Sequence, residues 1–312
     1  MTHPIRPFRF GVQASGAPDR ESWLEICRRT EGNGYDVLTL PDHFSDQLAP
    51  VPALMAAAAA TTTLRVGSLV FDNDYKHPVV LAKEMATLDV LSDGRLEIGL
   101  GAGWMLSDYE QSGIEYDSAA VRIDRFEEGL AIMKSALGPH PFSFQGEHYR
   151  ISGYDGLPKP VQERPPILIG GGGKRVLSIA ARQADIVGIN ATLTAGKVGP
   201  EAFDSMSPAA VDAKVAIVHE AAGERLDHLE MNVRAFMVNV TDDRDSVIQG
   251  LATMLAVDVS MLEESPFALV GNPAQIADSL RARRERWGFS YVIVGAEDID
   301  SFAPVVAELA GT

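Results

Sequence analysis

The chain has 312 residues, and its 27 lysines and arginines against 43 aspartates and glutamates give a formal net charge of −16. Such an acidic chain lacks the positive surface field that nucleic acids and anionic membranes need, so we expect neither as a partner. The hydrophobic fraction of 46% is ample for a large core, but the longest apolar run, Val51–Ala60, is far shorter than the roughly 20 residues of a membrane span.

The first half of the sequence alternates short apolar runs with amphipathic stretches. Four runs rich in apolar or β-branched residues predict the strands Phe8–Val12, Val37–Leu40, Arg65–Val70 and Leu96–Leu100. Gly34 is a stop signal for the first predicted helix, and Pro78 suits the first turn of the third. The helices predicted after the four strands are Asp19–Asn33, Pro52–Thr61, Pro78–Ser92 and Ala119–Ala136.

The second half repeats this alternation less regularly. The predicted strands are Ile167–Ile169, Ile186–Ile189, Met231–Val240 and Tyr291–Val294. The predicted helices are Arg175–Ala184, Pro208–Ala222, Asp245–Leu255, Pro273–Trp287 and Ser301–Ala310. Two stretches exceed a minimal strand–helix alternation and are candidate lid or cofactor-covering loops: Pro139–Pro166, with a hairpin expected at Phe142–Tyr149, and Ala191–Ser207.

Eight strands, each followed by a helix, predict an α/β fold in which parallel strands close into a single (β/α)₈ TIM barrel with insertion loops. Residues 1–312 are expected to form this one domain. A doubly wound open sheet is the alternative, but no topological break is evident in the alternation. The segment Gly99–Gly103 resembles a dinucleotide fingerprint only in part, because it lacks the full glycine spacing.

The cysteine content and the first residues bear on where the protein is found. Cys27 is the one cysteine, so no intrachain disulfide can form, and its helical context predicts a small buried residue rather than a reactive thiol. The segment Met1–Pro7 has no apolar stretch of the kind that a secretory signal contains. We therefore expect a cytoplasmic protein.

In a barrel of this kind the active site lies at the carboxyl ends of the strands. That rule alone selects the polar and glycine residues that directly follow the predicted strands. They are Gln13, Ser15, Asp42, His43, Asp72, Asn73, Asp74, Gly101–Trp104 and Gly170–Gly173.

The run of four glycines, Gly170–Gly173, is the strongest local signal. Glycines allow the backbone to approach a ligand closely, and the helix that follows presents free N–H groups to an anion. Lys174 and Arg175 add positive charge. A glycine-rich turn without a ligand is the alternative, but the position between a strand and a helix favours phosphate binding.

His43 follows the second strand and can donate or accept a proton near neutral pH. Asp42 either orients His43 or caps the next helix, and the sequence does not distinguish these roles. No metal site is predicted, because the seven histidines are scattered and neither a cysteine pair nor a zinc-protease motif occurs.

At these positions the sequence resembles the luciferase-like monooxygenase superfamily, and within it the branch of probable oxidoreductases that depend on coenzyme F420, a deazaflavin. The resemblance extends from about residue 8 to about residue 295, and the ordered set of motifs is more specific than any one of them. The matching segments are Leu40–Phe44, Arg65–Val70, Lys76–Pro78, Ala86–Leu96, Gly99–Trp104, Pro166–Gly173 and Gly271–Ala277.

The resemblance implies positions for the cofactor. A bulge in the third strand, with a non-proline cis peptide expected between Ser68 and Leu69, would contact the middle of the ring. The phosphate would bind at Gly171, Gly172 and Gly173, with Gly170 also next to the cofactor, and the ribityl chain would pass Ala102 and Gly103. Asp42 and His43 match an acidic residue and a histidine near the ring in relatives.

The resemblance also implies a limit on the substrate. In the sugar-phosphate dehydrogenase branch a glutamate donates a proton at the position of Trp104, and tryptophan cannot replace it. The sequence therefore favours hydride transfer between F420 and an uncharged small organic substrate, with Gln13 and Trp104 at the substrate pocket. Trp104 packing in the barrel is the alternative to a place in that pocket.

Two other functions remain open on the sequence alone. One is an FMN-dependent monooxygenase of the same superfamily that uses reduced flavin and O₂. The other is a non-catalytic deazaflavin-binding protein, for which the pair Asp42 and His43 would have no purpose. Relatives are commonly dimers, so we expect a homodimer, and the alanine-rich stretch Leu54–Ala60 would permit close helix packing.

Overall fold

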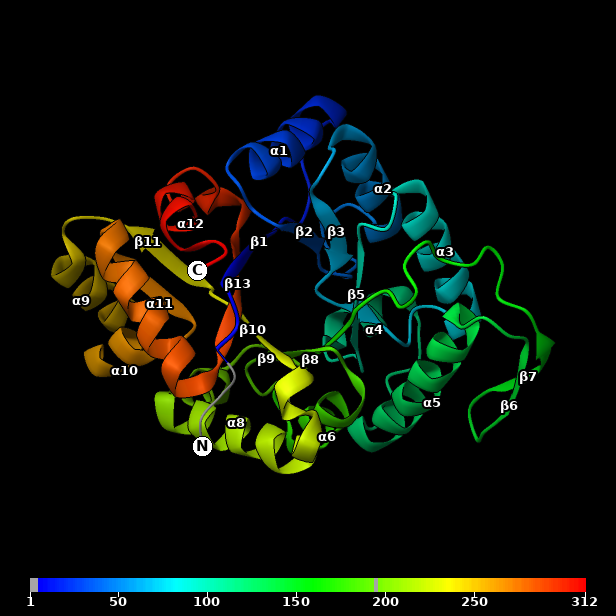
Figure 1. The fold of residues 1–312 in the computed structure, drawn as a ribbon. Helices are drawn as coiled ribbons and strands as arrows, with labels where there is room; N and C mark the ends of the chain where they lie inside the picture. The colour runs from blue at the N-terminus through cyan, green and yellow to red at the C-terminus, as the bar shows by residue number, and fades with distance from the viewer. Residues whose placement is uncertain (1–4, 194–195) are drawn as a thin grey trace.

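The computed structural model describes residues 5–193 and 196–312 of the chain. Its centre is a ring of eight parallel strands, seen nearly end-on in Figure 1. These strands are β1 (Arg9–Gln13), β2 (Val37–Leu40), β3 (Arg65–Ser68), β5 (Leu96–Gly101), β8 (Ile167–Gly171), β9 (Ile186–Ile189), β10 (Glu230–Arg234) and β13 (Phe289–Gly295).

The ring is closed by hydrogen bonding at every neighbouring pair of strands. β1 pairs with both β2 and β13, which joins the two ends of the chain within the sheet. The pairing of β3 with β5, in which Val66 lies opposite Leu96, completes the circle. A short extension of β3, β4 (Phe71–Asp72), pairs further along β5. The structure is therefore the predicted parallel barrel, and the open doubly wound sheet is excluded.

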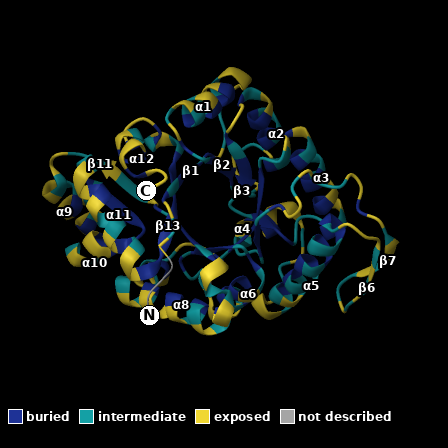
Figure 2. Ribbon diagram, in the orientation of Figure 1, coloured by how far each residue is buried: buried dark blue, intermediate teal, exposed yellow. Residues whose placement is uncertain are grey.

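Eight helices surround the barrel and alternate with its strands (Figure 1). They are α1 (Arg20–Gly32), α2 (Pro50–Ala60), α3 (Pro78–Leu91), α5 (Ala119–Leu137), α6 (Lys174–Gln183), α8 (Pro208–Ala222), α11 (Pro273–Trp287) and α12 (Ala303–Leu309). Local signals set their limits: Asp19 accepts from the N–H of Ser22 at the start of α1, and Asn272 forms a reciprocal cap with Gln275 before α11. Buried residues line the barrel side of these helices and exposed residues the outer side, as Figure 2 shows.

The inside of the barrel is filled in layers. An apolar layer of Val37, Leu168, Ile186 and Ile293 crosses its middle. Below it, at the amino ends of the strands, Tyr291 packs against the Arg9 guanidinium, whose carbon lies 3.8 Å from the ring centre. The barrel is thus a packed core with a closed floor, and a cavity can form only above the apolar layer.

The predicted strand Met231–Val240 is wrong as a single element. The chain forms β10, leaves the barrel at Ala235, and then forms β11 (Met237–Val240), which pairs in parallel with β12 (Ala268–Gly271), a strand that the sequence did not predict. The N–H of Ala235 still bonds to Ile293 of the barrel, but that of Phe236 bonds to Phe267 of the added sheet. Residues rich in β propensity continue on both sides of this change of partner, so the local sequence pattern does not mark it.

Further elements extend the barrel on both sides. The expected hairpin is present as β6 (Phe142–Gln145) and β7 (Arg150–Tyr154). Beside α11 lie α9 (Arg244–Leu255) and α10 (Val259–Glu264), packed against the added sheet (Figure 1). The predicted loop Ala191–Ser207 contains a short helix, α7 (Pro200–Asp204), and its residues 194–195 lie outside the described residues, as do residues 1–4 of the segment Met1–Pro7. Within the described chain, no helix combines the length and apolar composition that a bilayer crossing requires.

Candidate active site

A cavity of about 680 Å³ opens at the carboxyl ends of the barrel strands, where the sequence predicts the active site. Its size lies within the range of small-molecule and cofactor sites. Among the residues selected only because they follow a strand, Asp72 and Gly101 line it, whereas Ser15, Asn73 and Asp74 do not. Of the residues assigned to catalysis, cofactor or substrate, all but one line it: Gln13, Asp42, His43, Leu69, Ala102, Gly103, Trp104, Gly170, Gly171, Gly172 and Gly173.

Ser68 is the exception. Its side chain is buried, and its hydroxyl donates to the carbonyl oxygen of Gly99 at 2.7 Å, so it joins β3 to β5 instead of facing the cavity. The expected cis peptide is wrong by one residue, because it joins Leu69 and Val70. Both of these residues line the cavity, and the amide of Gln13 donates to the carbonyl oxygen of Leu69 at 2.9 Å.

The four glycines form a bare backbone wall. Gly170 and Gly171 end β8, and Gly173 is the N-terminal cap of α6, where no side chain accepts from the first N–H groups. A Cβ added at Gly172 would lie 2.2 Å from the carbonyl oxygen of Ala191, which explains the need for glycine there. One at Gly173 would meet nothing within 4 Å. The N–H groups at this helix start are therefore free to receive an anion.

Arg122 of α5 adds a cation to the same wall. The residue is buried, lines the cavity, and donates through Nη2 to the carbonyl oxygen of Gly103 at 3.4 Å. Its guanidinium carbon lies 4.2 Å from the ring centre of Tyr116, and its buried Nε has no hydrogen-bond partner among the described residues. A buried guanidinium without a paired carboxylate, beside uncapped N–H groups, fits a ligand with an anionic tail, as a phosphorylated ring cofactor has.

His43 is held in place by a residue that the sequence analysis did not select. Its Nδ1 lies 2.6 Å from Oδ2 of Asp108, in the short helix α4 (Leu106–Ser112). The Asp108 carboxylate is almost fully buried and also accepts from the hydroxyl of Tyr75 at 3.0 Å. Because an ionised carboxylate can only accept, Nδ1 carries the hydrogen and Nε2 is the nitrogen left for proton exchange. The ring of Trp104 packs edge-on against His43, with 5.7 Å between ring centres.

Asp42 has neither of the roles that the sequence left open. It accepts from the backbone N–H of Asp72 at 3.3 Å, while His43 pairs with Asp108 and α2 begins without a side-chain cap. Burial raises the pKa of Asp42, and burial together with the neighbouring Asp74 carboxylate raises the pKa of Asp72 to about 7. Two acids thus line the cavity, and burial raises the pKa of both.

The outer part of the cavity is mostly apolar. Its wall comes from the loop before α8, the turn after β10, and the end of α9, in the residues Val198, Phe203, Met206, Phe236, Met237, Met254 and Leu255. Arg234, at the end of β10, is the charged residue nearest to this turn; its Nε donates to Gln13 at 3.0 Å and its guanidinium carbon lies 5.3 Å from the Phe236 ring centre. The outer part of the cavity is thus apolar apart from Arg234.

Asp108, Arg122 and Arg234 are the site residues that sequence reasoning missed. Arg234 ends a strand, but the predicted strand continued to Val240 and hid that end. Asp108 and Arg122 lie on helices, so a rule based on strand ends cannot find them. No group of three His, Cys, Asp or Glu side chains in residues 5–193 and 196–312 is placed to hold a metal ion.

A closed parallel barrel with an uncapped helix start and a cavity at the carboxyl ends of its strands is the architecture of enzymes that carry their active site at this end. The model of the family described as luciferase-like monooxygenase matches residues 4–291. The chain therefore belongs to the luciferase-like monooxygenase family, a family of oxidoreductases.

Curated relatives divide between two cofactors. The chain is similar to the F420-dependent glucose-6-phosphate dehydrogenase of Nakamurella multipartita, with 30% identity over 80% of this chain and 72% of that protein. It is also similar to the FMNH₂-dependent dimethylsulfone monooxygenase of Pseudomonas fluorescens, with 31% identity over 42% of this chain and 35% of that protein.

A solved structure shows the same fold at low identity. An F420-dependent secondary alcohol dehydrogenase, in complex with an F420–acetone adduct, superposes with a TM-score of 0.78 and 17% identity, covering 97% of this chain and 98% of that one. The architecture is thus shared over nearly the whole length of both chains.

Proposed function

We propose that the protein is an oxidoreductase that transfers a hydride between coenzyme F420 and an uncharged small organic substrate. The observation that carries the proposal is His43, fixed by Asp108 at the wall of a cavity whose other wall is the anion-binding start of α6. The relatives named for F420 cover 57–80% of the chain and those named for FMNH₂ 42–56%, which favours the deazaflavin.

The residues of the glycine wall would hold the cofactor. The N–H groups at Gly172 and Gly173 would bind its phosphate, with the positive charge of Arg122 on the same wall, and Ala102 and Gly103 would border its chain. Leu69 and Val70 would support the ring from below. The bound cofactor would supply the hydride chemistry.

The chain itself would manage the proton. With Nδ1 bonded to Asp108, the Nε2 of His43 can exchange a proton with a hydroxyl or carbonyl oxygen of the substrate. Asp108, itself held by Tyr75, would keep the ring in this tautomer and orientation. The apolar outer wall excludes water and selects an uncharged substrate. Trp104 occupies the edge of the pocket beside His43, so we expect no turnover of glucose 6-phosphate.

Titration with F420 and with FMN, read by ring fluorescence, tests the cofactor. We expect micromolar binding of F420 and much weaker binding of FMN. The second candidate, an FMN-dependent monooxygenase, is supported by the relative from Pseudomonas fluorescens and requires the opposite result, together with oxygen consumption in the presence of reduced FMN. Tight F420 binding without turnover of any alcohol, ketone or enone in a substrate panel would instead indicate a non-catalytic carrier.

Substitution of His43 tests the chemistry. His43→Ala should leave F420 binding nearly unchanged and lower kcat by about 10²–10⁴-fold, because the proton loses its acceptor. Asp108→Asn should lower kcat by a smaller factor, since the histidine remains but its tautomer is no longer fixed. His140, which is exposed and outside the cavity wall, is the matched control, and His140→Ala should behave as the wild type. Equal kcat in all four proteins would remove the role assigned to His43.

A further inference from the structure

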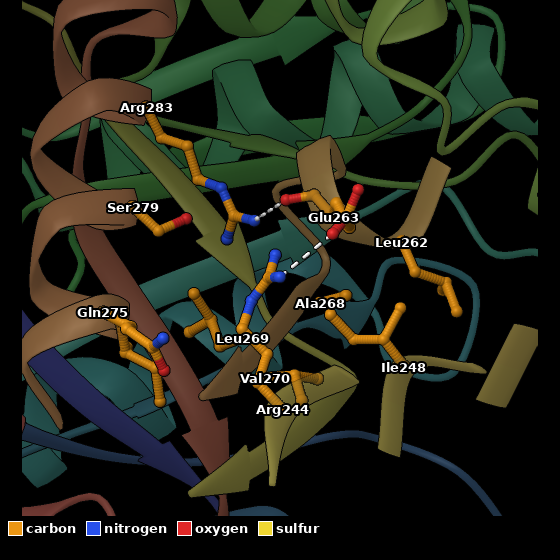
Figure 3. Close-up of a pocket in the computed structure, with 11 residues that line it drawn as sticks. Arg244, Ile248, Leu262, Glu263, Ala268, Leu269, Val270, Gln275, Ser279 and Arg283 are labelled. Carbon is orange, nitrogen blue, oxygen red and sulfur yellow. Dashed lines mark hydrogen bonds and ion pairs between the residues drawn. The ribbon is translucent and has the colours of Figure 1, made fainter. Parts of the chain in front are cut away.

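A second, smaller cavity lies away from the barrel mouth, between the added sheet and the helices that cover it. It measures about 50 Å³ and is lined by residues of α9, α10, β12 and α11, none of which lines the cavity of the candidate active site. Figure 3 shows the guanidinium groups of Arg244 and Arg283 extending toward the same space from opposite sides, with Glu263 beside them.

Arg283 is the unusual member of this group. Only 7% of its surface is exposed, and its Nη1 is buried without a hydrogen-bond partner within the part of the chain that the structure describes. Its Nη2 donates only to the backbone oxygen of Glu263, at 3.4 Å. Burial, and next the charge of Arg244, lower the pKa of Arg283 to about 9. No carboxylate of the described chain lies within ion-pair distance of this guanidinium.

The carboxylates closest to the two arginines are bonded to Arg244 and not to Arg283. The Glu263 carboxylate bonds to Nη1 of Arg244 at 3.0 Å. The Asp245 carboxylate lies 3.5 Å from the same nitrogen, and its side chain is almost fully exposed to solvent. The cavity therefore contains two cations and one closely bound anion. A buried guanidinium without a counter-charge destabilises a fold, so a site of this kind gains free energy when an anion enters.

We propose that this cavity binds a small oxyanion of the phosphate or sulfate class, held between Arg244 and Arg283. Two guanidinium groups supply parallel N–H donors that match the oxygens of such an anion, and the hydroxyl of Ser279 lines the same space. A water needs about 10–15 Å³ of comparable volume, so the cavity has room for a group of several heavy atoms. The anion supplies the charge that Arg283 lacks.

Thermal unfolding in inorganic phosphate, compared with chloride at equal ionic strength and pH, tests the site. The measurements are made in the Gly173→Asp background, so that phosphate at the start of α6 does not contribute. We expect Tm to rise by about 2–4 °C at phosphate tenfold above Kd, with the same Kd by calorimetry. Equal Tm values in phosphate and chloride would overturn the proposal.

Three substitutions test whether the rise of Tm in phosphate depends on Arg244 and Arg283. Arg283→Met should abolish the response to phosphate and, without phosphate, unfold at an unchanged or higher temperature, because it removes the uncompensated charge. Arg244→Gln, which leaves Arg283 in place, should weaken phosphate binding at least tenfold. Arg286→Gln removes an exposed arginine of the same helix that pairs with Asp212, and it should respond as the parent protein does. An undiminished response in both Arg283→Met and Arg244→Gln would place the anion elsewhere.

A crystal structure with selenate provides a readout that does not depend on the stability of any variant. An anomalous peak between the two guanidinium groups is expected. A structure in which the Glu263 carboxylate bridges both arginines, with no anion, would overturn the proposal. F420 binding plays no part in these measurements, so their failure would leave the proposed function untouched.

Discussion

The two ends of the barrel hold charged side chains in opposite conditions. At the floor, Glu97 is buried between Arg9 and Arg65, and Arg9 also pairs with Glu230 at 2.7 Å. Burial alone would raise the pKa of Glu97, but the two guanidinium groups hold it below its ordinary value. Tyr291 completes the layer through a hydrogen bond to Glu97. Each of these four charged side chains thus has an opposite charge in contact with it.

At the mouth some polar and charged groups lack such compensation. Asp72 lies beside another acid and its pKa is raised, Arg122 has a buried Nε without a partner in the described chain, and the N–H groups before α6 have no side-chain cap. The same fold thus satisfies its polar groups where they only support the barrel and leaves them unsatisfied where a ligand is expected. Polar groups left unsatisfied in this way are a physical indication of a binding site.

Removing the Glu97 carboxylate from the ion pairs at the floor should give the largest change in stability. Glu97→Gln would leave the Arg65 guanidinium without a carboxylate and Arg9 with Glu230 alone, and we expect the free energy of unfolding to fall by about 3 kcal/mol. Urea denaturation measures it. The matched control is Glu308→Gln, which removes an exposed carboxylate paired with Arg281 and should cost less than about 1 kcal/mol. Similar losses in the two variants would contradict the contrast between the floor and an ordinary surface.

Removing the buried Asp72 carboxyl at the mouth should increase stability above neutral pH, the opposite of the effect at the floor. Because the pKa of Asp72 rises from 3.8 to about 7 on folding, the native state retains a proton that the unfolded chain has lost. Its contribution to stability is therefore present below pH 4 and is lost as pH rises toward 7. Asp72→Asn should remove this slope and be more stable than the wild type at pH 8 by roughly 2 kcal/mol. Asp46→Asn, at an exposed position, is the control; parallel pH profiles for Asp72→Asn and the wild type would refute the expectation.

Placing a carboxylate of the chain itself at the uncapped start of α6 should give the smallest of the three changes in free energy. Gly173 has extended backbone angles and free space at its Cβ, so Gly173→Asp can cap α6 with its own carboxylate. We expect stability to be kept or slightly raised and cofactor affinity to fall about tenfold, or ~1.4 kcal/mol. Gly173→Asn, a neutral cap, should lose less affinity. If F420 bound both variants as tightly as the wild type, its phosphate would not lie at this helix.

Much of the architecture could be predicted from the sequence because each barrel strand has its own apolar run and each helix its own boundary signal. The short strand β12 could not, since Ala268–Gly271 is stabilised by pairing with a distant segment and not by a local pattern. The rule of strand ends placed His43 and the glycines on the cavity wall. The rule missed Asp108, because this residue lies on a helix and reaches His43 only in the folded structure. Asp42 is adjacent to His43 in sequence, but the two side chains have different hydrogen-bond partners.

The closed floor has a consequence for the order of events in the proposed reaction. Arg9, Glu97 and Tyr291 leave no passage through the barrel axis, and the apolar layer above them is packed. Cofactor and substrate would thus share a single entrance. Whichever of the two lies deeper has to arrive first and depart last, so the two molecules cannot exchange independently within one catalytic cycle.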